Sequence, residues 1–224
     1  MQQKKDSRRV IVRIAAFALL IALAATAAYL FVRHGHRYRV LDTAELDFAT
    51  AQNEYASEAQ RILVDSALMT VGKVSYFWGG KSYSVGWDSR WGTPAEVTSP
   101  GHSTSGTTIP YGLDCSGFVL WCYIQLGAGK AETIEKLGAG TWNQWDKTTA
   151  VKKSDVRIGD LAFINQYPGN SGNHVGICIG FLKNGEPLIA HCSATQNLVV
   201  VSTCGNEFKY FRRTCFDLNP GNAE

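Results

Sequence analysis

Cys115, His174 and His191 are the residues of this 224-residue sequence whose types and settings could do covalent chemistry. Cys115 lies where a glycine-rich loop leads into an apolar run, so we expect it at the first turn of a helix. There, backbone N–H groups without helical partners and the positive end of the helix dipole favour thiolate over thiol. A thiolate nucleophile needs a base, and the base needs a partner that orients it. The two histidines lie on predicted neighbouring strands and can fill both roles, in the chain order nucleophile, base, orienting residue.

The other cysteines and histidines suit different roles. Cys122, one heptad after Cys115, has no helix terminus beside it and is expected to be a small core residue. His102 lies in a long loop, where we expect it in solvent. A metal site could be drawn from four side chains, His174, Cys178, His191 and Cys192. Strand alternation directs Cys192 away from the face of His191, and the sequence has no Cys-x-x-Cys pair, so we expect no metal. We expect no other cofactor either. Besides Cys115 the sequence has five cysteines, an odd number, and buried thiols are the default interpretation, so we expect no required disulfide.

A buried helix and a sheet must position these residues. Residues 118–124 are apolar without interruption, which is typical of a helix that is buried on all sides. Five β-type runs follow, at 160–164, 174–182, 187–194, 198–203 and 208–216, with turns expected at Asn184-Gly185 and Gly205-Asn206. The pattern predicts an α+β fold in which an antiparallel sheet of about five to six strands packs on the helix. Alternation puts His174, Gly176 and Cys178 on one face, which we expect to leave room for the helix terminus.

The segment 42–72 is predicted to be helical. Hydrophobic residues recur in it every seven positions, at Phe48, Tyr55, Ile62 and Met69. This spacing predicts one helical stripe that ends at Gly72 and packs on the main domain.

The segment 81–113 is predicted to be a long loop. It is rich in Ser, Thr, Gly and Pro and has no hydrophobic period. A loop of this length inside a compact domain is uncommon and often functional, so we expect it near a site. Trp87 and Trp91 should hold it down, either in a small core of its own or on the side that faces a substrate.

The N-terminus carries the pattern of a membrane anchor. Residues 14–32 are nineteen uncharged, mostly apolar residues, and at ~1.5 Å per residue they would span ~28 Å as a helix, close to the thickness of a bilayer core. Five Lys and Arg precede this span and three follow it, so we expect the tail 1–13 in the cytoplasm and the body outside. A cleaved signal peptide is the alternative, because Ala25-Thr26-Ala27 fits a cleavage site. Either reading exports the domain.

Composition and charge narrow the class further. The chain is 45% hydrophobic and 11% aromatic, which excludes disorder as its main state. Its net charge of +3 is uneven, because residues 1–39 hold 8 of the 22 Lys and Arg and 1 of the 19 Asp and Glu. The remainder has 14 basic and 18 acidic residues, a net charge of −4. This part has no basic stripe, so we expect no nucleic-acid partner.

Five motifs make the sequence resemble the NlpC-type cell-wall peptidases over roughly residues 60–216. They are Tyr76-Phe77-Trp78-Gly79-Gly80, Asp114-Cys115-Ser116-Gly117-Phe118-Val119, Gly159-Asp160-Leu161, His174-Val175-Gly176-Ile177 and Ile189-Ala190-His191. Their order is that of the family, which makes the match specific. The resemblance implies a papain-like α+β domain, to which we assign residues 46–220, after a juxtamembrane linker at 33–45. It also implies a monomeric bacterial endopeptidase that cuts peptidoglycan stem peptides after γ-D-glutamate, usually before a diamino acid.

The resemblance also assigns roles. Cys115, His174 and His191 match the nucleophile, the base and the third polar residue of the family, and His191 should fix the tautomer of His174. Substrate-binding roles are expected for Tyr76, Trp78, Asp114 and Ser116. The insertion 81–113 departs from the family pattern and puts specificity in doubt more than chemistry. Two alternatives are a papain-like enzyme that hydrolyses or transfers lipid acyl groups and a non-catalytic wall-binding module, which would typically have lost a member of the triad.

Overall fold

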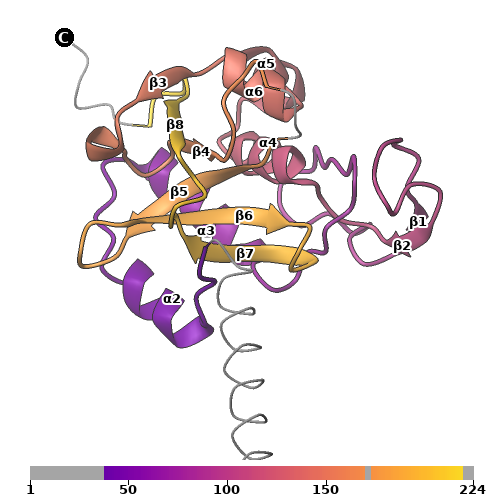
Figure 1. The fold of residues 1–224 in the computed structure, drawn as a ribbon, viewed down its shortest axis with the longest axis horizontal. Coiled ribbons are helices and arrows are strands. Elements are labelled where there is room, and N and C mark those ends of the chain that lie inside the picture. Colours follow the sequence, from indigo (N-terminus) through magenta and orange to yellow (C-terminus); the bar gives the residue numbers. More distant parts are fainter. Residues whose placement is uncertain (1–37, 170–172, 219–224) are drawn as a thin grey trace, which may run out of the picture. The chain divides into compact units, whose positions relative to one another are not determined.

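Six antiparallel strands form the main sheet in the computed structural model, which describes residues 38–169 and 173–218 (Figure 1). They are β3 (Thr149–Val151), β4 (Leu161–Phe163), β5 (Val175–Phe181), β6 (Pro187–Ser193), β7 (Leu198–Thr203) and β8 (Tyr210–Arg213). Their spatial order is β3-β8-β4-β5-β6-β7. The predicted α+β class and the antiparallel sheet of five to six strands are therefore confirmed.

The last strand does not continue the meander. Strands β4 to β7 follow one another as neighbours, but β8 returns to pair with β4 on one side and β3 on the other. The expected hairpin at Gly205-Asn206 is therefore wrong. The chain instead leaves β7 and buries Phe208 in a second apolar cluster with Cys178, Ile189 and Phe211. Burying this aromatic ring on the sheet face outweighs the local preference for a tight turn.

Two earlier segments cover the outer edge of β7. The Thr203 N–H donates to Arg39 O (2.9 Å) and the Leu41 N–H donates to Val201 O (2.9 Å). Further along the strand, the N–H of Gly72 donates to the carbonyl oxygen of Val199 (2.9 Å). Both segments thus pair with backbone groups of β7 that the sheet itself does not use.

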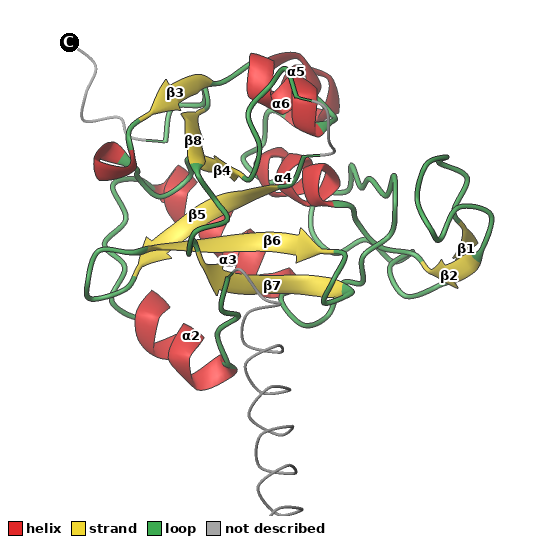
Figure 2. Ribbon diagram, in the orientation of Figure 1, coloured by secondary structure: helices red, strands yellow, loops and turns green. Residues whose placement is uncertain are grey.

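Helix α4 (Cys115–Ile124), one of the red helices in Figure 2, is buried at every residue, as predicted. It packs on β5 and β6 and contacts α3, α5 and α6. Trp121, Tyr123 and Phe118 are among its fully buried side chains and fill the main core. Two short helices follow it, α5 (Gly129–Leu137) and α6 (Thr141–Asp146), and a 3₁₀ turn spans Lys153–Asp155.

The single helical stripe expected over 42–72 is wrong. The segment forms two helices, α2 (Thr43–Thr50) and α3 (Glu58–Thr70). Asp42 and Ser57 each cap a separate helix through a side-chain oxygen, and these caps start two helices where the seven-residue spacing suggests one. Phe48 and Met69 are 57% and 37% exposed, whereas the buried face of α3 consists of Gln60, Leu63, Val64, Ser66, Ala67 and Thr70.

The insertion 81–113 is irregular apart from two three-residue strands, β1 (Pro94–Glu96) and β2 (Thr108–Pro110), which lie away from the main sheet (Figure 2). Trp91 is buried in the main core, where its ring meets that of Trp121 edge to face at 5.0 Å. Trp87 packs on Trp91 at 4.8 Å and stays 47% exposed. The insertion is therefore held by the domain core rather than by a small core of its own.

The predicted tail 1–13 and anchor 14–32 lie outside the described residues, as does the first part of the linker 33–45. Among the residues that the structure describes, no helix combines the length and the apolar character needed to cross a membrane.

Candidate active site

Cys115 is the first residue of α4, and the preceding Asp114 is the N-cap of that helix. Burial, and after it the negative charge of Asp114, raise the pKa of the Cys115 thiol to about 12. Backbone N–H groups of Val175 and Ser116 and the charge of Lys81 lower it, but by less. The helix terminus was expected to favour thiolate, yet burial outweighs it, so the resting side chain is a neutral thiol.

His174 and His191 lie side by side, as the strand prediction requires. His174 Nε2 and His191 Nδ1 are 2.9 Å apart, and the ring planes meet at 83°. Burial lowers the pKa of His174 to about 4 and holds the pKa of His191 well below its usual value, so both rings are neutral at pH 7. The outer nitrogen of the pair, His191 Nε2, lies 3.1 Å from the buried hydroxyl of Ser202.

Ser202 is absent from the predicted site, although the sequence holds a signal for it. In the register of β6 and β7, His191 is opposite Val200, and Ser202 lies two positions along the same strand. Two residues apart on a strand means the same face. A serine that follows four apolar residues of its strand, on the face of a buried histidine, is therefore a candidate hydrogen-bond partner.

The expected orientation of the strand face needs correction. Cys178 packs in the cluster around Phe208, on the opposite face of the sheet from the main core residues Val175 and Ile177. The face of Cys178 therefore does not receive α4. His174 still lies close to α4, because it directly precedes Val175, whose N–H contacts the Cys115 thiol.

Cys192 points away from the histidine pair, as expected from alternation. Its Sγ lies 3.0 Å from Leu113 O on the side of the main core. Within residues 38–169 and 173–218, no group of three or more His, Cys, Asp or Glu side chains could hold a metal ion. All six cysteines are free thiols.

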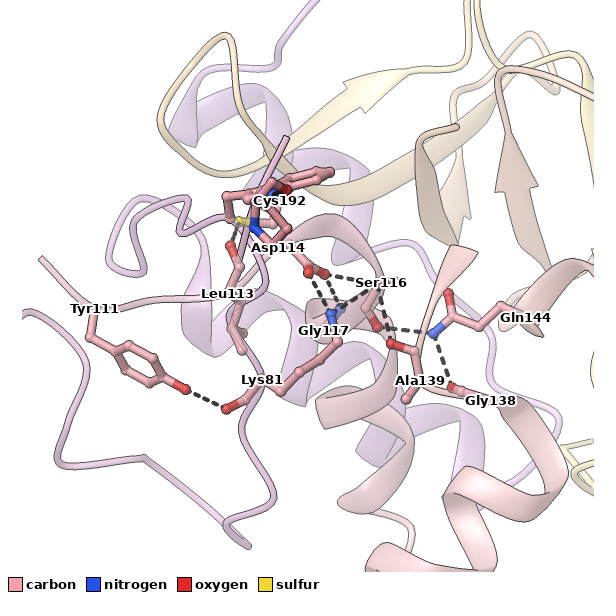
Figure 3. A network of polar contacts seen from close by, with 12 residues as sticks. Lys81, Tyr111, Leu113, Asp114, Ser116, Gly117, Gly138, Ala139, Gln144 and Cys192 are labelled. Carbon is pink, nitrogen blue, oxygen red and sulfur yellow. Dashed lines mark hydrogen bonds and ion pairs between the residues drawn. The ribbon is translucent and has the colours of Figure 1, made fainter. Parts of the chain in front are cut away.

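Asp114 and Ser116 join a polar network with Lys81, which the sequence interpretation misses (Figure 3). Asp114 Oδ1 accepts from the Gly117 N–H (2.6 Å) and from the Ser116 hydroxyl (2.8 Å), while Oδ2 forms an ion pair with Lys81 Nζ. Lys81 Nζ also lies 3.1 Å from Ser116 Oγ, and Gln144 Nε2 donates to Ser116 O (2.9 Å). The carboxylate expected to bind a substrate amine is thus already paired with a cation of the protein. The spacing of 33 residues between Lys81 and Asp114 carries no signal for this contact.

Residues 72–215 match the NlpC/P60 family. The chain belongs to the NlpC/P60 family.

Individual members of the NlpC/P60 family share modest identity with this chain. The peptidoglycan DL-endopeptidase CwlO of Bacillus licheniformis is 30% identical over 121 residues, which are 52% of this chain and 21% of CwlO. The chain therefore spans about a fifth of the length of that relative. Among solved structures, the peptidoglycan hydrolase RipB of Mycobacterium tuberculosis is 25% identical, with a TM-score of 0.47 over 73% of this chain and 69% of RipB. RipD of M. tuberculosis, a non-catalytic NlpC/p60 domain protein adapted to peptidoglycan binding, is 19% identical, with a TM-score of 0.46 over 70% of this chain and 98% of RipD.

Tyr76 and Trp78, from the first NlpC/P60 motif, lie beside the insertion. Burial raises the pKa of Tyr76, and the neighbouring Cys115 raises it further, so the phenol is protonated next to the thiol. Trp78 Nε1 donates to Pro100 O (2.8 Å), and its ring stacks on that of His102 at 5.2 Å. His102, expected in solvent, also lies 5.8 Å from the Tyr76 ring. The insertion thus covers Trp78 and reaches the residue that adjoins Cys115.

Proposed function

We propose that this chain is a cell-wall cysteine peptidase that hydrolyses peptidoglycan stem peptides after γ-D-glutamate. Cys115 would be the nucleophile, His174 the base and His191 the residue that orients the base. The observation that carries the proposal is the contact between the two imidazoles, in which His174 Nε2 and His191 Nδ1 are 2.9 Å apart. His174 directly precedes Val175, the first residue of β5. Because the Val175 N–H contacts the Cys115 thiol, the nucleophile and the histidine pair lie at the same end of β5.

Proton transfer from Cys115 accompanies the attack rather than preceding it. With the pKa of Cys115 raised and that of His174 lowered, the resting pair is neutral thiol and neutral imidazole. As Cys115 Sγ bonds to the scissile carbonyl carbon, the thiol proton moves to His174. The backbone N–H of Cys115 and the terminus of α4 stabilise the oxyanion.

The second half of the reaction returns the enzyme. His174 gives its proton to the leaving amine, which departs and leaves a thioester on Cys115. Water then attacks the thioester and His174 accepts a proton from it. Cys115 leaves as a thiolate and takes that proton from His174, and the new carboxylic acid of D-glutamate loses its own proton to solvent. His191 keeps the His174 ring in place throughout.

Mass spectrometry of digested muropeptides tests the proposal. The purified full-length chain should release fragments that end in D-glutamate, and Cys115→Ala should abolish the release. Cys122→Ala is the matched control, because this cysteine lies in the same helix with a fully buried side chain. Cleavage that survives Cys115→Ala would overturn the nucleophile assignment. Muropeptide binding without cleavage would favour a non-catalytic module, and release of fatty acid from lipid would favour the acyl hydrolase.

We also propose that residues 14–32 anchor the protein in a bacterial membrane, with the catalytic domain on the cell-wall side. The support is the apolar span and the excess of Lys and Arg before it. Fractionation of cells should recover the intact chain in the membrane, and external protease should digest the domain from whole protoplasts. A mature N-terminus near residue 28 would show instead that the segment is a cleaved signal peptide.

A further inference from the structure

His191 is the middle member of a three-residue hydrogen-bond chain. Its Nδ1 lies 2.9 Å from His174 Nε2, and its Nε2 lies 3.1 Å from Ser202 Oγ. His191 and Ser202 are both fully buried. Since burial holds the pKa of His191 well below its usual value, the ring is neutral and carries one N–H.

The position of that one proton determines what His174 can do. If His191 Nε2–H donates to Ser202, then Nδ1 accepts from His174 Nε2–H, and His174 Nδ1 keeps its lone pair. If the Ser202 hydroxyl donates instead, His191 Nδ1–H donates to His174, whose Nδ1 then carries the proton and cannot accept another. Among the described residues, no hydrogen bond engages His174 Nδ1.

Proton uptake by His174 selects the first arrangement. A protonated His174 has an N–H on both nitrogens, so its Nε2–H must donate to His191 Nδ1. His191 must then carry its proton on Nε2 and needs an acceptor there. The hydroxyl of Ser202 is the hydrogen-bond partner that the structure gives His191 Nε2, so it is that acceptor.

The surroundings leave few other partners for His191 Nε2. The Tyr38 ring meets the His191 ring edge to face at 4.9 Å, and the Phe208 ring lies 5.2 Å away. Backbone pairing at Val40 and Ser202 keeps the segment that carries Tyr38 against β7. Two aromatic rings therefore enclose the imidazole and disfavour a water molecule in place of the hydroxyl.

We propose that Ser202 is a positioning residue: it holds His191 as the Nε2–H tautomer, which leaves His174 Nδ1 able to accept the proton of Cys115. This inference rests on the proposed function for its catalytic consequence. The tautomer itself exists whether or not the chain cleaves peptide, so it can be measured independently.

Nitrogen NMR of ¹⁵N-histidine-labelled protein tests the tautomer, and muropeptide kinetics test its consequence. The native chain should show His191 protonated at Nε2. Ser202→Ala should move His191 toward the Nδ1–H tautomer and lower kcat roughly 10- to 100-fold with KM unchanged, the scale set by one buried donor left without a partner. Ser202→Thr keeps the hydroxyl and should keep the native tautomer.

Ser66→Ala is the matched control. Ser66 is also buried, but it lies in α3 and its hydroxyl donates to the carbonyl oxygen of Ile62 (2.6 Å) and not to an imidazole. It should leave the histidine signals and kcat unchanged. His191 protonated at Nδ1 in the native chain would overturn the proposal even if Ser202→Ala does not fold. If the native chain shows His191 protonated at Nε2 but cleaves no stem peptide, the proposed role of Ser202 in setting the tautomer stands and the proposed function is refuted.

Discussion

Replacing Asp114 by asparagine separates the two tasks of this carboxylate. Its Oδ1 caps α4 by accepting the Gly117 N–H at 2.6 Å, and its Oδ2 forms the ion pair with Lys81. Asparagine caps helices about as well as aspartate, whereas alanine does not cap. Asp114→Asn therefore removes mainly the negative charge, and Asp114→Ala removes both the charge and the cap.

The structure sets the size of each loss. The side chains of Asp114 and Lys81 are 10% and 19% exposed. Removing one partner of a fully buried pair costs about 3–5 kcal/mol, and the residual exposure of Lys81 reduces this to roughly 2 kcal/mol. Loss of the cap adds about 1 kcal/mol. We expect the free energy of unfolding to fall by about 2 kcal/mol in Asp114→Asn and about 3 kcal/mol in Asp114→Ala.

The same charge acts on the nucleophile with a definite sign. Asp114 raises the pKa of Cys115 and Lys81 lowers it. Asp114→Asn should therefore lower the pKa of Cys115, and Lys81→Met should raise it. A buried methionine in place of the lysine also removes the cation that Asp114→Asn leaves without its partner, so the double variant should recover part of the lost stability.

Two assays decide the outcome. Urea denaturation at pH 7 gives the free energies of unfolding, and the pH dependence of Cys115 alkylation by iodoacetamide, followed by mass spectrometry, gives the direction of each pKa change. Asp114→Asn as stable as the native chain would refute the ion-pair argument. An alkylation profile displaced to higher pH in Asp114→Asn would refute the electrostatic one.

Three further predictions follow from burial and close contact. Because the pKa of His174 is lowered to about 4, the unfolded chain binds more protons than the folded chain between pH 4 and 6.5. Urea denaturation should therefore show that the free energy of unfolding falls by up to roughly 3 kcal/mol as the pH is lowered from 6.5 to 4, and that this fall is smaller in His174→Gln. Gly117→Ala should cost about 1–3 kcal/mol, because its Cβ would lie 2.1 Å from a backbone carbonyl oxygen; Gly140→Ala, whose nearest contact would be 3.4 Å, should cost less by the same measurement. Tyr38→Ala should lower the thermal midpoint by removing the ring from His191, whereas Tyr83→Ala, at an exposed ring, should not.

The local sequence pattern predicts which segments form helices and strands better than it predicts which segments they pair with. The unbroken apolar run of α4 and the β-type runs carry their structure in their own residues, and strand adjacency then brings His174 to His191. The break between α2 and α3 depends on whether Asp42 and Ser57 act as caps, which the seven-residue spacing hides. The return of β8 to β4 depends on where Phe208 is buried, a tertiary choice that the turn residues do not encode.

The polar partners were harder to predict because they are distant in sequence. Lys81 and Asp114 are brought together by the whole insertion, so no spacing rule relates them. Ser202 follows from strand register, which becomes available only once β6 and β7 are paired. The electrostatic state of Cys115 also escapes prediction, since a helix terminus is visible in the sequence while the extent of burial is not.

The double cover on β7 protects the sheet from intermolecular pairing. An uncovered edge strand offers a row of backbone donors and acceptors to any second chain, which promotes aggregation. Here Arg39 and Leu41 occupy one part of that edge and Gly72 another, while the strand at the opposite border, β3, is only three residues long. A chain shortened so that it begins after Leu41 would lack part of this cover. If such a chain forms dimers or fibres, they would result from pairing at the uncovered edge of β7 and would not indicate an assembly of the intact protein.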